Sequence, residues 1–240
     1  MDSYCQTDVG LKRNNNQDFV YASNHSVGTL AGLLIVADGM GGQAAGDLAS
    51  RLCVETMVDS IQASSHKGAV KVLSEAIREA NKAVTSKASS DPALEGMGTT
   101  LVAATPENGS LIVANVGDSR LYLIDDDRIE QITHDHSLVE EMVRAGKLKK
   151  EQAKNHPKKN IITRAIGEIQ DPEVDYFDVA LNRGDIALLC SDGLTNMVED
   201  EQIFRIVRGA QSLQDAGAKL IDAANRAGGK DNISVVLAKF

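Results

Sequence analysis

The chain has 240 residues, of which 42% are hydrophobic and 25% charged, and this composition predicts one soluble globular domain over residues 1–240. The formal net charge of −9 disfavours a general binder of nucleic acid or anionic membranes, because such partners repel an acidic surface, and it favours a cationic partner such as a metal ion. The absence of Trp and an aromatic content of 3% disfavour a platform that stacks bases or sugars.

Strand-forming runs recur along the chain, several of them bounded by Gly or Asp turn signals. They cover residues 18–24, 33–37, 99–105, 111–116, 120–124, 128–132, 174–180, 185–190 and 233–238. The aspartates at 125–127 lie between two of these runs and predict a hairpin turn. Sequential hairpins imply antiparallel pairing of the strands.

Longer segments carry apolar residues at helical spacing along one face and predict helices. They cover residues 46–63, 69–88, 199–208 and 213–227. Ser212 is expected to cap the last of these helices, and Ser137 to cap a further helix that begins at Leu138. Because one-sided helices need a sheet to cover, we expect an α+β fold with two antiparallel sheets and helices outside them.

Cysteine usage and the start of the chain bear on the compartment. Cys5, Cys53 and Cys190 are odd in number, lack CxxC spacing and lie in apolar segments, which is typical of reduced core residues. No run approaches the roughly 18 to 20 apolar residues of a membrane span, and the first ten residues lack the order of a signal peptide. We expect a cytoplasmic protein without a membrane span.

Five aspartates interrupt the apolar runs at places where strands begin or end: Asp18, Asp38, Asp118, Asp192 and Asp231. The end of one antiparallel strand and the start of its neighbour lie on the same edge of a sheet, so these carboxylates could meet on one rim. Crowded carboxylates repel one another unless cations lie among them, and oxygen ligands select Mg²⁺ or Mn²⁺. The sequence therefore favours a metal site there.

Each aspartate taken alone is more often a turn residue, since Asp before Gly is common turn chemistry. The set of five favours the metal hypothesis over that alternative. A glycine-loop nucleotide binder is disfavoured, because the glycines of "ADGMGG" (37–42) lack the lysine of a phosphate-binding loop.

The motifs resemble, in family order, those of the Mg²⁺/Mn²⁺-dependent Ser/Thr protein phosphatases of type 2C in their compact bacterial form. They are "GLKRNNNQD" (10–18), "VADGMGG" (36–42), "GMGTT" (96–100), "ANVGDSRLY" (114–122), "DHS" (135–137), "ITRAIG" (162–167), "LLCSDGL" (188–194) and "GGKDNISVV" (228–236). The resemblance covers nearly the whole chain. It implies a central β-sandwich of two antiparallel sheets with helices on both outer faces, and a flap near the site at about 137–162.

The resemblance also implies a ligand set for two Mg²⁺ or Mn²⁺ ions. Asp38 corresponds to the ligand that bridges them and is central to catalysis. Asp18 and the carbonyl of Gly39 correspond to ligands of one ion. Asp192 and Asp231 correspond to ligands of the other.

Further residues match the family pattern around this pair. Asp118 corresponds to a ligand, shared with Asp192, of a third and weaker ion. Arg13 matches the phosphate-binding arginine, whose planar fork suits two phosphate oxygens. Asn232 lies beside the metal ligands as a supporting group. Met40 stands where eukaryotic relatives often have a histidine, so we expect metal-bound water to protonate the leaving group.

Other polar residues are given a structural interpretation. His134 and His136 lack a third soft ligand nearby, so they are assigned to the base of the flap rather than to zinc. Thr163 and Arg164 are expected to tie the flap to the core. The "GMGTT" motif is interpreted as strand entry and packing.

A lysine-rich stretch at 147–159 falls within the expected flap, where we read it as a mobile surface segment. Lys149, Lys150 and Lys158 could attract an anionic phosphopeptide there, and a solvated helical face is the equal alternative.

The leading hypothesis is hydrolysis of phosphoserine and phosphothreonine in proteins by a water that bridges two ions. The expected partners are phosphoproteins, including a cognate bacterial Ser/Thr kinase that the enzyme opposes and its substrates, with no nucleic acid, and we expect a monomer. Hydrolysis of small phosphate esters is an alternative that uses the same site. A non-catalytic module that binds phosphoproteins is another, although all five aspartates and Arg13 are present.

Overall fold

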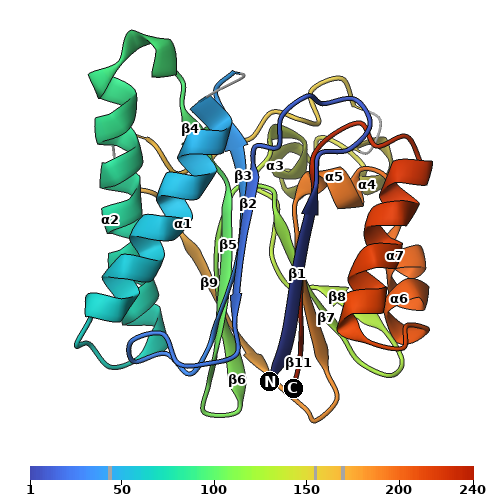
Figure 1. The fold of residues 1–240 in the computed structure, drawn as a ribbon. Helices are drawn as coiled ribbons and strands as arrows, with labels where there is room; N and C mark the ends of the chain where they lie inside the picture. The colour runs from blue at the N-terminus through green and yellow to red at the C-terminus, as the bar shows by residue number, and fades with distance from the viewer. Residues whose placement is uncertain (43–44, 154–155, 169–170) are drawn as a thin grey trace.

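The computed structural model describes residues 1–42, 45–153, 156–168 and 171–240, and two antiparallel sheets form its centre (Figure 1). The first sheet has the strand order β1 (Asp2–Asp8), β11 (Ile233–Lys239), β10 (Ile186–Cys190), β7 (Arg120–Ile124) and β8 (Ile129–Gln131). The second has the order β2 (Asp18–Ser23), β3 (Leu33–Met40), β5 (Leu101–Glu107), β6 (Ser110–Val116) and β9 (Asp175–Ala180), with β4 (Gly98–Thr99) paired to β3. This arrangement confirms the α+β class with two antiparallel sheets.

Helices cover the outer face of each sheet, as Figure 1 shows. On the second sheet lie α1 (Ala45–Ala63) and α2 (Ala69–Ser90), followed by a 3₁₀ turn, η1 (Pro92–Leu94). On the first sheet lie α6 (Asp200–Arg208) and α7 (Leu213–Arg226). Three short helices, α3 (Leu138–Arg144), α4 (Lys150–Ala153) and α5 (Asp192–Thr195), lie at the end of the sandwich away from the chain termini.

The burial of both faces of strand β3 explains why its sequence is continuously apolar. Leu33, Ile35 and Ala37 pack against the helices α1 and α2, whereas Leu34 and Val36 pack against the other sheet. Because both faces of the strand are covered, neither set of alternating positions can be polar. The buried apolar run ends at Asp38, near the end of the strand.

Several sequence predictions are confirmed at the level of single elements. The helix that Ser137 caps is present, and the Ser137 Oγ accepts from the backbone N–H of Glu140. Asp125 Oδ1 accepts from the N–H groups of Asp127 and Arg128, which closes the β7–β8 hairpin. Thr163 connects the flap to the core through its N–H, which donates to the His136 carbonyl.

Two sequence expectations need correction. Strand β1 was not predicted, because its residues, DSYCQTD, are mostly polar and only partly buried at the edge of the sheet. Cys5 lies on that strand and is half-buried, whereas Cys53 and Cys190 are buried as expected, and all three thiols are free.

A membrane-spanning helix, which needs about 20 mostly apolar residues, is not found in the described part of the chain.

Tyr122 joins sheet and helix in the layer between the first sheet and α6. Its side chain is fully buried. The hydroxyl accepts from Arg120 Nη1 (2.9 Å) and donates to Asp200 Oδ1 (3.1 Å) at the start of α6. Burial raises the pKa of Tyr122 well above its ordinary value, so the group remains a neutral donor.

We expect Tyr122→Phe to lower the free energy of unfolding by about 1–3 kcal/mol, because two charged partners lose a buried hydrogen bond. Urea denaturation measures the change. Tyr4→Phe is the matched control, because the Tyr4 hydroxyl donates only to Gln6 Oε1 near the surface, and its effect should stay below about 0.5 kcal/mol. Equal losses in the two variants would contradict the role of Tyr122.

Candidate metal centre

Asp18 and Asp38 lie directly opposite each other on β2 and β3. The backbone of Asp38 is fixed by the adjoining segment of chain. Its N–H donates to Thr100 Oγ1 (3.0 Å), and its carbonyl accepts from Thr100 N (2.9 Å) and Thr99 Oγ1 (3.0 Å). The "GMGTT" motif thus positions a candidate ligand, beyond the packing role expected from the sequence.

Ser191 joins the two sheets beside this pair. Its Oγ donates to Asp18 Oδ2 (2.7 Å) and accepts from Ser234 N (3.0 Å). Ser191 directly precedes Asp192, the first residue of α5. The hydrogen bond from Ser191 to Asp18 therefore brings Asp192, which follows the first sheet, close to Asp18 of the second sheet. The other oxygen of Asp18, Oδ1, is buried and has no hydrogen-bond partner in the described part of the chain. Such an oxygen is costly unless a cation is bound to it.

Asp118 follows β6 in a turn that requires glycine. Gly117 has a φ of +105°, and a Cβ there would lie 2.7 Å from the Cβ of Thr100. Ser119 Oγ is hydrogen-bonded to Thr100 Oγ1 (2.7 Å). The residue that holds Asp38 therefore also holds the turn that carries Asp118.

Asn232 fixes the loop that carries Arg13. The Asn232 Nδ2 donates to the carbonyls of Val9 and Asn15 (both 2.9 Å), and its Oδ1 accepts from Gln17 N (2.9 Å). The amide is buried, and its role as a supporting group for bound metal stays a prediction.

Arg13 lies at the rim of the cluster and is about half exposed. Its Nη2 forms an ion pair of 2.8 Å with Asp231 Oδ2. Asp231 Oδ1 accepts from Asn232 N (2.9 Å). The predicted phosphate ligand is thus bound to a predicted metal ligand.

The five aspartates influence one another electrostatically. Burial raises the pKa of Asp38 well above its ordinary value, and the charges of the other four, Asp18, Asp192, Asp118 and Asp231, raise it further. Burial and neighbouring carboxylates likewise raise the pKa of Asp118 to about 8, and the pKa values of Asp18 and Asp192 to about 6. The structure therefore brings all five predicted carboxylates together.

The donor set fits divalent cations. It consists of carboxylate oxygens with raised pKa values and one buried, unpaired oxygen, which are the ligands that Mg²⁺ and Mn²⁺ prefer. In the described ranges, no three carboxylate, imidazole or thiol side chains already form a group able to hold an ion. The aspartates thus approach one another without closing into a ligand cage.

Gly39 permits close contact between β3 and the start of α1. A Cβ at this position would lie 1.9 Å from the carbonyl oxygen of Gly46 and 2.7 Å from that of Gln17. The strand could not approach these segments with a side chain there. The role of the Gly39 carbonyl as a ligand stays a prediction.

His136 is a structural residue at the base of the flap. Its Nδ1 accepts from Gly117 N (3.1 Å), and its Nε2 lies 3.1 Å from Asp175 Oδ2. Arg164 Nη1 donates to Asp175 Oδ1 (2.9 Å), so the flap is tied to β9 as predicted. His134 packs edge-on against Phe177.

The flap reaches the metal centre through a lysine that the sequence analysis did not single out. Lys159 Nζ donates to Asn196 Oδ1 (2.9 Å), and Asn196 Nδ2 donates to Asp192 Oδ2 (2.8 Å). Lys149 and Lys158 are exposed, and neither side chain forms a hydrogen bond or ion pair with another described residue. The side chain of Lys150 lies outside the described part of the structure.

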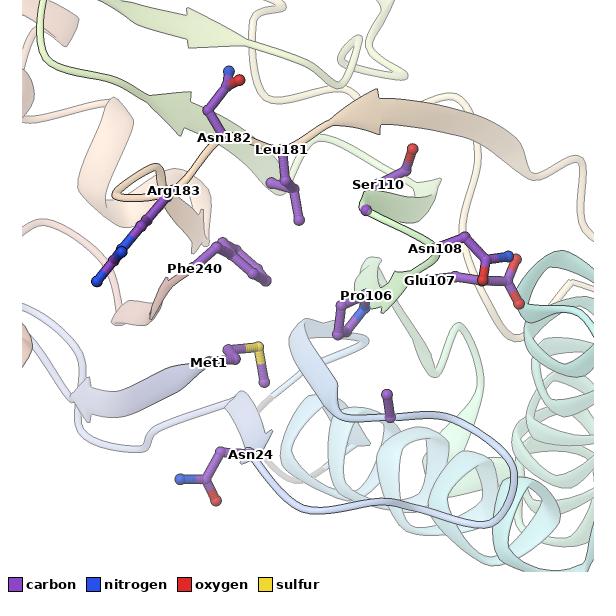
Figure 2. A pocket seen from close by; sticks show the side chains of 12 residues that line it. Met1, Asn24, Pro106, Glu107, Asn108, Ser110, Leu181, Asn182, Arg183 and Phe240 are labelled. Atoms are coloured by element: carbon purple, nitrogen blue, oxygen red, sulfur yellow. The ribbon is translucent and has the colours of Figure 1, made fainter.

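A cavity of about 470 Å³ lies at the opposite end of the sandwich (Figures 1 and 2). Met1, Pro106, Leu181 and Phe240 line it, with Arg183 at its edge. None of the five aspartates contributes to this lining. The cavity is therefore separate from the metal centre.

The protein phosphatase 2C family model matches residues 10–233. The serine/threonine phosphatase stp of Listeria innocua is 41% identical over 245 residues, which cover 100% of this chain and 96% of that protein. The serine/threonine phosphatase of S. agalactiae has a TM-score of 0.91 and 37% identity, with 98% of each chain covered. The catalytic domain of PstP, solved with 2 manganese ions, has a TM-score of 0.85 and 35% identity, over 99% of this chain and 97% of that one.

The crowded carboxylates predict how stability depends on pH in metal-free protein. Unfolded, these groups ionise near their ordinary pKa of about 4, whereas in the folded chain Asp18 and Asp192 ionise at about 6 and Asp118 at about 8. The folded state thus binds more protons between about pH 4 and 8. Its free energy of unfolding falls as the pH rises through this window.

We expect a loss on the order of 6 kcal/mol between pH 5 and pH 8.5 in chelator, measured by urea denaturation. Adding Mn²⁺ at pH 8.5 should restore the stability. Asp118→Asn should flatten the pH dependence, whereas the exposed control Asp59→Asn should leave it unchanged. Equal stability of the chelated wild type at the two pH values would contradict the proposed crowding.

Proposed function

The chain belongs to the protein phosphatase 2C family, and we propose that residues 1–240 form one catalytic domain that hydrolyses phosphoserine and phosphothreonine in proteins with Mn²⁺ or Mg²⁺. The relatives named above are serine/threonine phosphatases, and this chain covers nearly their whole length. The family makes the chain an enzyme of the same class. The metal requirement, the roles of individual residues and the substrates are inferred from its own site.

The observation that carries the proposal is the convergence of five aspartates from both sheets. Repulsion among them and the orphaned Oδ1 of Asp18 create a need for positive charge that the protein groups meet only in part. The manganese ions in the related PstP domain support divalent cations as the missing charge.

We assign the ligands as two groups around Asp38. Asp18 and the Gly39 carbonyl serve one ion, and Asp192 and Asp231 serve the other. Asp118 and Asp192 offer a site for a third, weaker ion. When bound, divalent ions supply charge neutralisation at the phosphate and activation of water for direct attack on phosphorus. No covalent phosphoenzyme is needed.

The residues of the chain supply position and recognition. Thr99 and Thr100 fix the backbone of Asp38, and Ser191 fixes Asp18. Arg13 offers two N–H groups to two phosphate oxygens and stabilises charge that builds up in the transition state. Arg13 pairs with Asp231 before substrate arrives. A cation held at Asp231 would weaken that pair, and the guanidinium would then be available to the phosphate.

The proton for the leaving alkoxide comes from water in the site. Met40, which follows the Asp38-Gly39 pair, has a thioether side chain that carries no proton to donate. In the cell we assign the enzyme to oppose a bacterial Ser/Thr kinase, in the cytoplasm and as a monomer.

Phosphothreonine peptide hydrolysis should need added Mn²⁺ or Mg²⁺ after chelation, and Asp38→Asn should lower kcat by at least about 100-fold because its metal-ligating charge is lost. In chelator the same variant should have a higher Tm than the wild type, because a repelling charge is removed. Asp59→Asn, on the exposed face of α1, is the control for both measurements.

Full activity of chelated wild type would refute the metal requirement, and unaltered turnover by Asp38→Asn would refute the bridging assignment. A phosphosugar assayed alongside the peptide separates protein substrates from small esters. A higher kcat/KM on the sugar would favour the ester hydrolase.

Arg13→Lys should lower kcat/KM on phosphopeptide by about 10- to 100-fold, because an ammonium cannot bind two phosphate oxygens side by side. Steady-state kinetics at saturating Mn²⁺ measures the loss. Arg183→Lys, at the cavity of the opposite end, is the matched control and should retain wild-type values. A twofold or smaller change in Arg13→Lys would remove the assigned phosphate contact.

A further inference from the structure

Large apolar side chains that face solvent are few in the described ranges. They are Val9 (37% exposed), Leu11 (64%), Val70 (45%) and Ile161 (46%). Val70 lies at the start of α2, on the outer layer. The other three belong to the two segments that border the metal centre, the loop after β1 and the flap. Figure 1 shows both segments at the same end of the sandwich.

Leu11 is held in place on the phosphate side of the site. Its N–H donates to the Gly229 carbonyl (2.8 Å), and the N–H of Lys12 donates to the same oxygen (3.1 Å). A Cβ on Gly229 would lie 2.8 Å from Leu11 Cγ, so the side chain rests against that backbone. Arg13, two residues further on, is bound to Asp231. The most exposed leucine thus stands on fixed backbone beside the phosphate ligand.

Ile161 lies on the flap, as Leu11 lies on the loop after β1. Its N–H donates to the Lys158 carbonyl (3.2 Å), and its own carbonyl accepts from Leu138 N (2.9 Å). Lys159, two residues earlier, reaches Asp192 through Asn196. Each exposed apolar side chain is therefore two residues from a cation in the sequence. Leu11 is two residues from Arg13, which pairs with Asp231, and Ile161 is two residues from Lys159, which contacts Asn196.

We propose that Leu11 and Ile161 bind apolar side chains on either side of the phosphorylated residue of a protein substrate. The inference rests on the proposed function, because it takes the phosphate to be held at Arg13 and the aspartates. In an extended substrate, the side chains two residues before and after the phosphorylated one lie about 7 Å from it and on the same face, and we assign the apolar side chains to these positions. The substrate class is a phosphoserine or phosphothreonine segment with aliphatic residues at these positions.

The charge around the two side chains favours this occupant over a second copy of the chain. Four cations lie within three residues of them in the sequence and attract an anionic phosphopeptide: Lys12, Arg13, Lys158 and Lys159. A second copy carries the same formal net charge of −9 and the same local cations, so two copies repel. Exposed apolar surface beside a polar site is typical of a recognition surface.

The test uses phosphothreonine peptides that differ only two residues before and after the phosphothreonine, with Leu at both positions or Ser at both. The kcat/KM ratio, Leu peptide over Ser peptide, is measured with saturating Mn²⁺ for wild type, Leu11→Asn, Ile161→Asn and the control Val70→Asn. We expect a wild-type ratio of at least about fivefold, from burial of aliphatic surface. It should fall to about twofold or less in Leu11→Asn and Ile161→Asn and persist in Val70→Asn.

Each remaining outcome overturns the inference. A wild-type ratio near one, or an equal fall of the ratio in Val70→Asn, would contradict the proposed contacts of Leu11 and Ile161 with the substrate. A change in oligomeric state by light scattering in Leu11→Asn, with the ratio retained, assigns Leu11 to self-association. Both peptides are measured with the same enzyme preparation. A loss of folded or metal-loaded protein therefore lowers both kcat/KM values equally and leaves their ratio unchanged. Failure of wild type to cleave either peptide would instead refute the proposed function.

Discussion

Repulsion among crowded carboxylates, of which Asp18 is buried, is the constraint on which the rest of this structure depends. Asp18, Asp38, Asp118, Asp192 and Asp231 each raise the pKa of a neighbour or have their own raised. Such a cluster is stable only if the surrounding backbone cannot move to separate its members. The hydroxyl network supplies that restraint, since Thr100 binds both Asp38 N and Ser119, and Ser191 binds both Asp18 and Ser234 N. Asp18 and the backbone of Asp38 are therefore held by neutral donors that add no further charge.

The sandwich provides the rigid frame for this network. Strands such as β3 are buried on both faces, so a shift of one residue in register would leave apolar side chains at the rim and an aspartate in the core. The same register that buries Leu34 and Val36 between the sheets sets Asp38 opposite Asp18. The strand register thus determines both the packing of the core and the geometry of the site. For this reason the candidate ligands can come from segments more than 200 residues apart in the sequence.

The sequence predicted the fold class and the five aspartates because these depend on local pattern. Apolar runs that end at an aspartate are visible without any knowledge of the partner strand. It missed β1, whose polar residues lie at a sheet edge, and it missed Lys159, whose partner Asn196 is distant in the chain. Thr100 was seen only as packing, because a threonine that binds another strand looks like any strand threonine. What the sequence lacks in each case is the identity of a long-range hydrogen-bond partner.

The ion pair between Arg13 and Asp231 connects the proposed phosphate ligand with a proposed metal ligand. An arginine free in solution would have to be ordered when phosphate binds, at a cost in side-chain entropy. Here the Asp231 carboxylate already orders the guanidinium at the edge of the metal cluster, and Asn232 orders the loop that carries it. A cation held at Asp231 would compete with Arg13 for the same carboxylate and would weaken this pair. With the roles proposed above for Asp231 and Arg13, cation binding and phosphate recognition would be coupled through this one carboxylate.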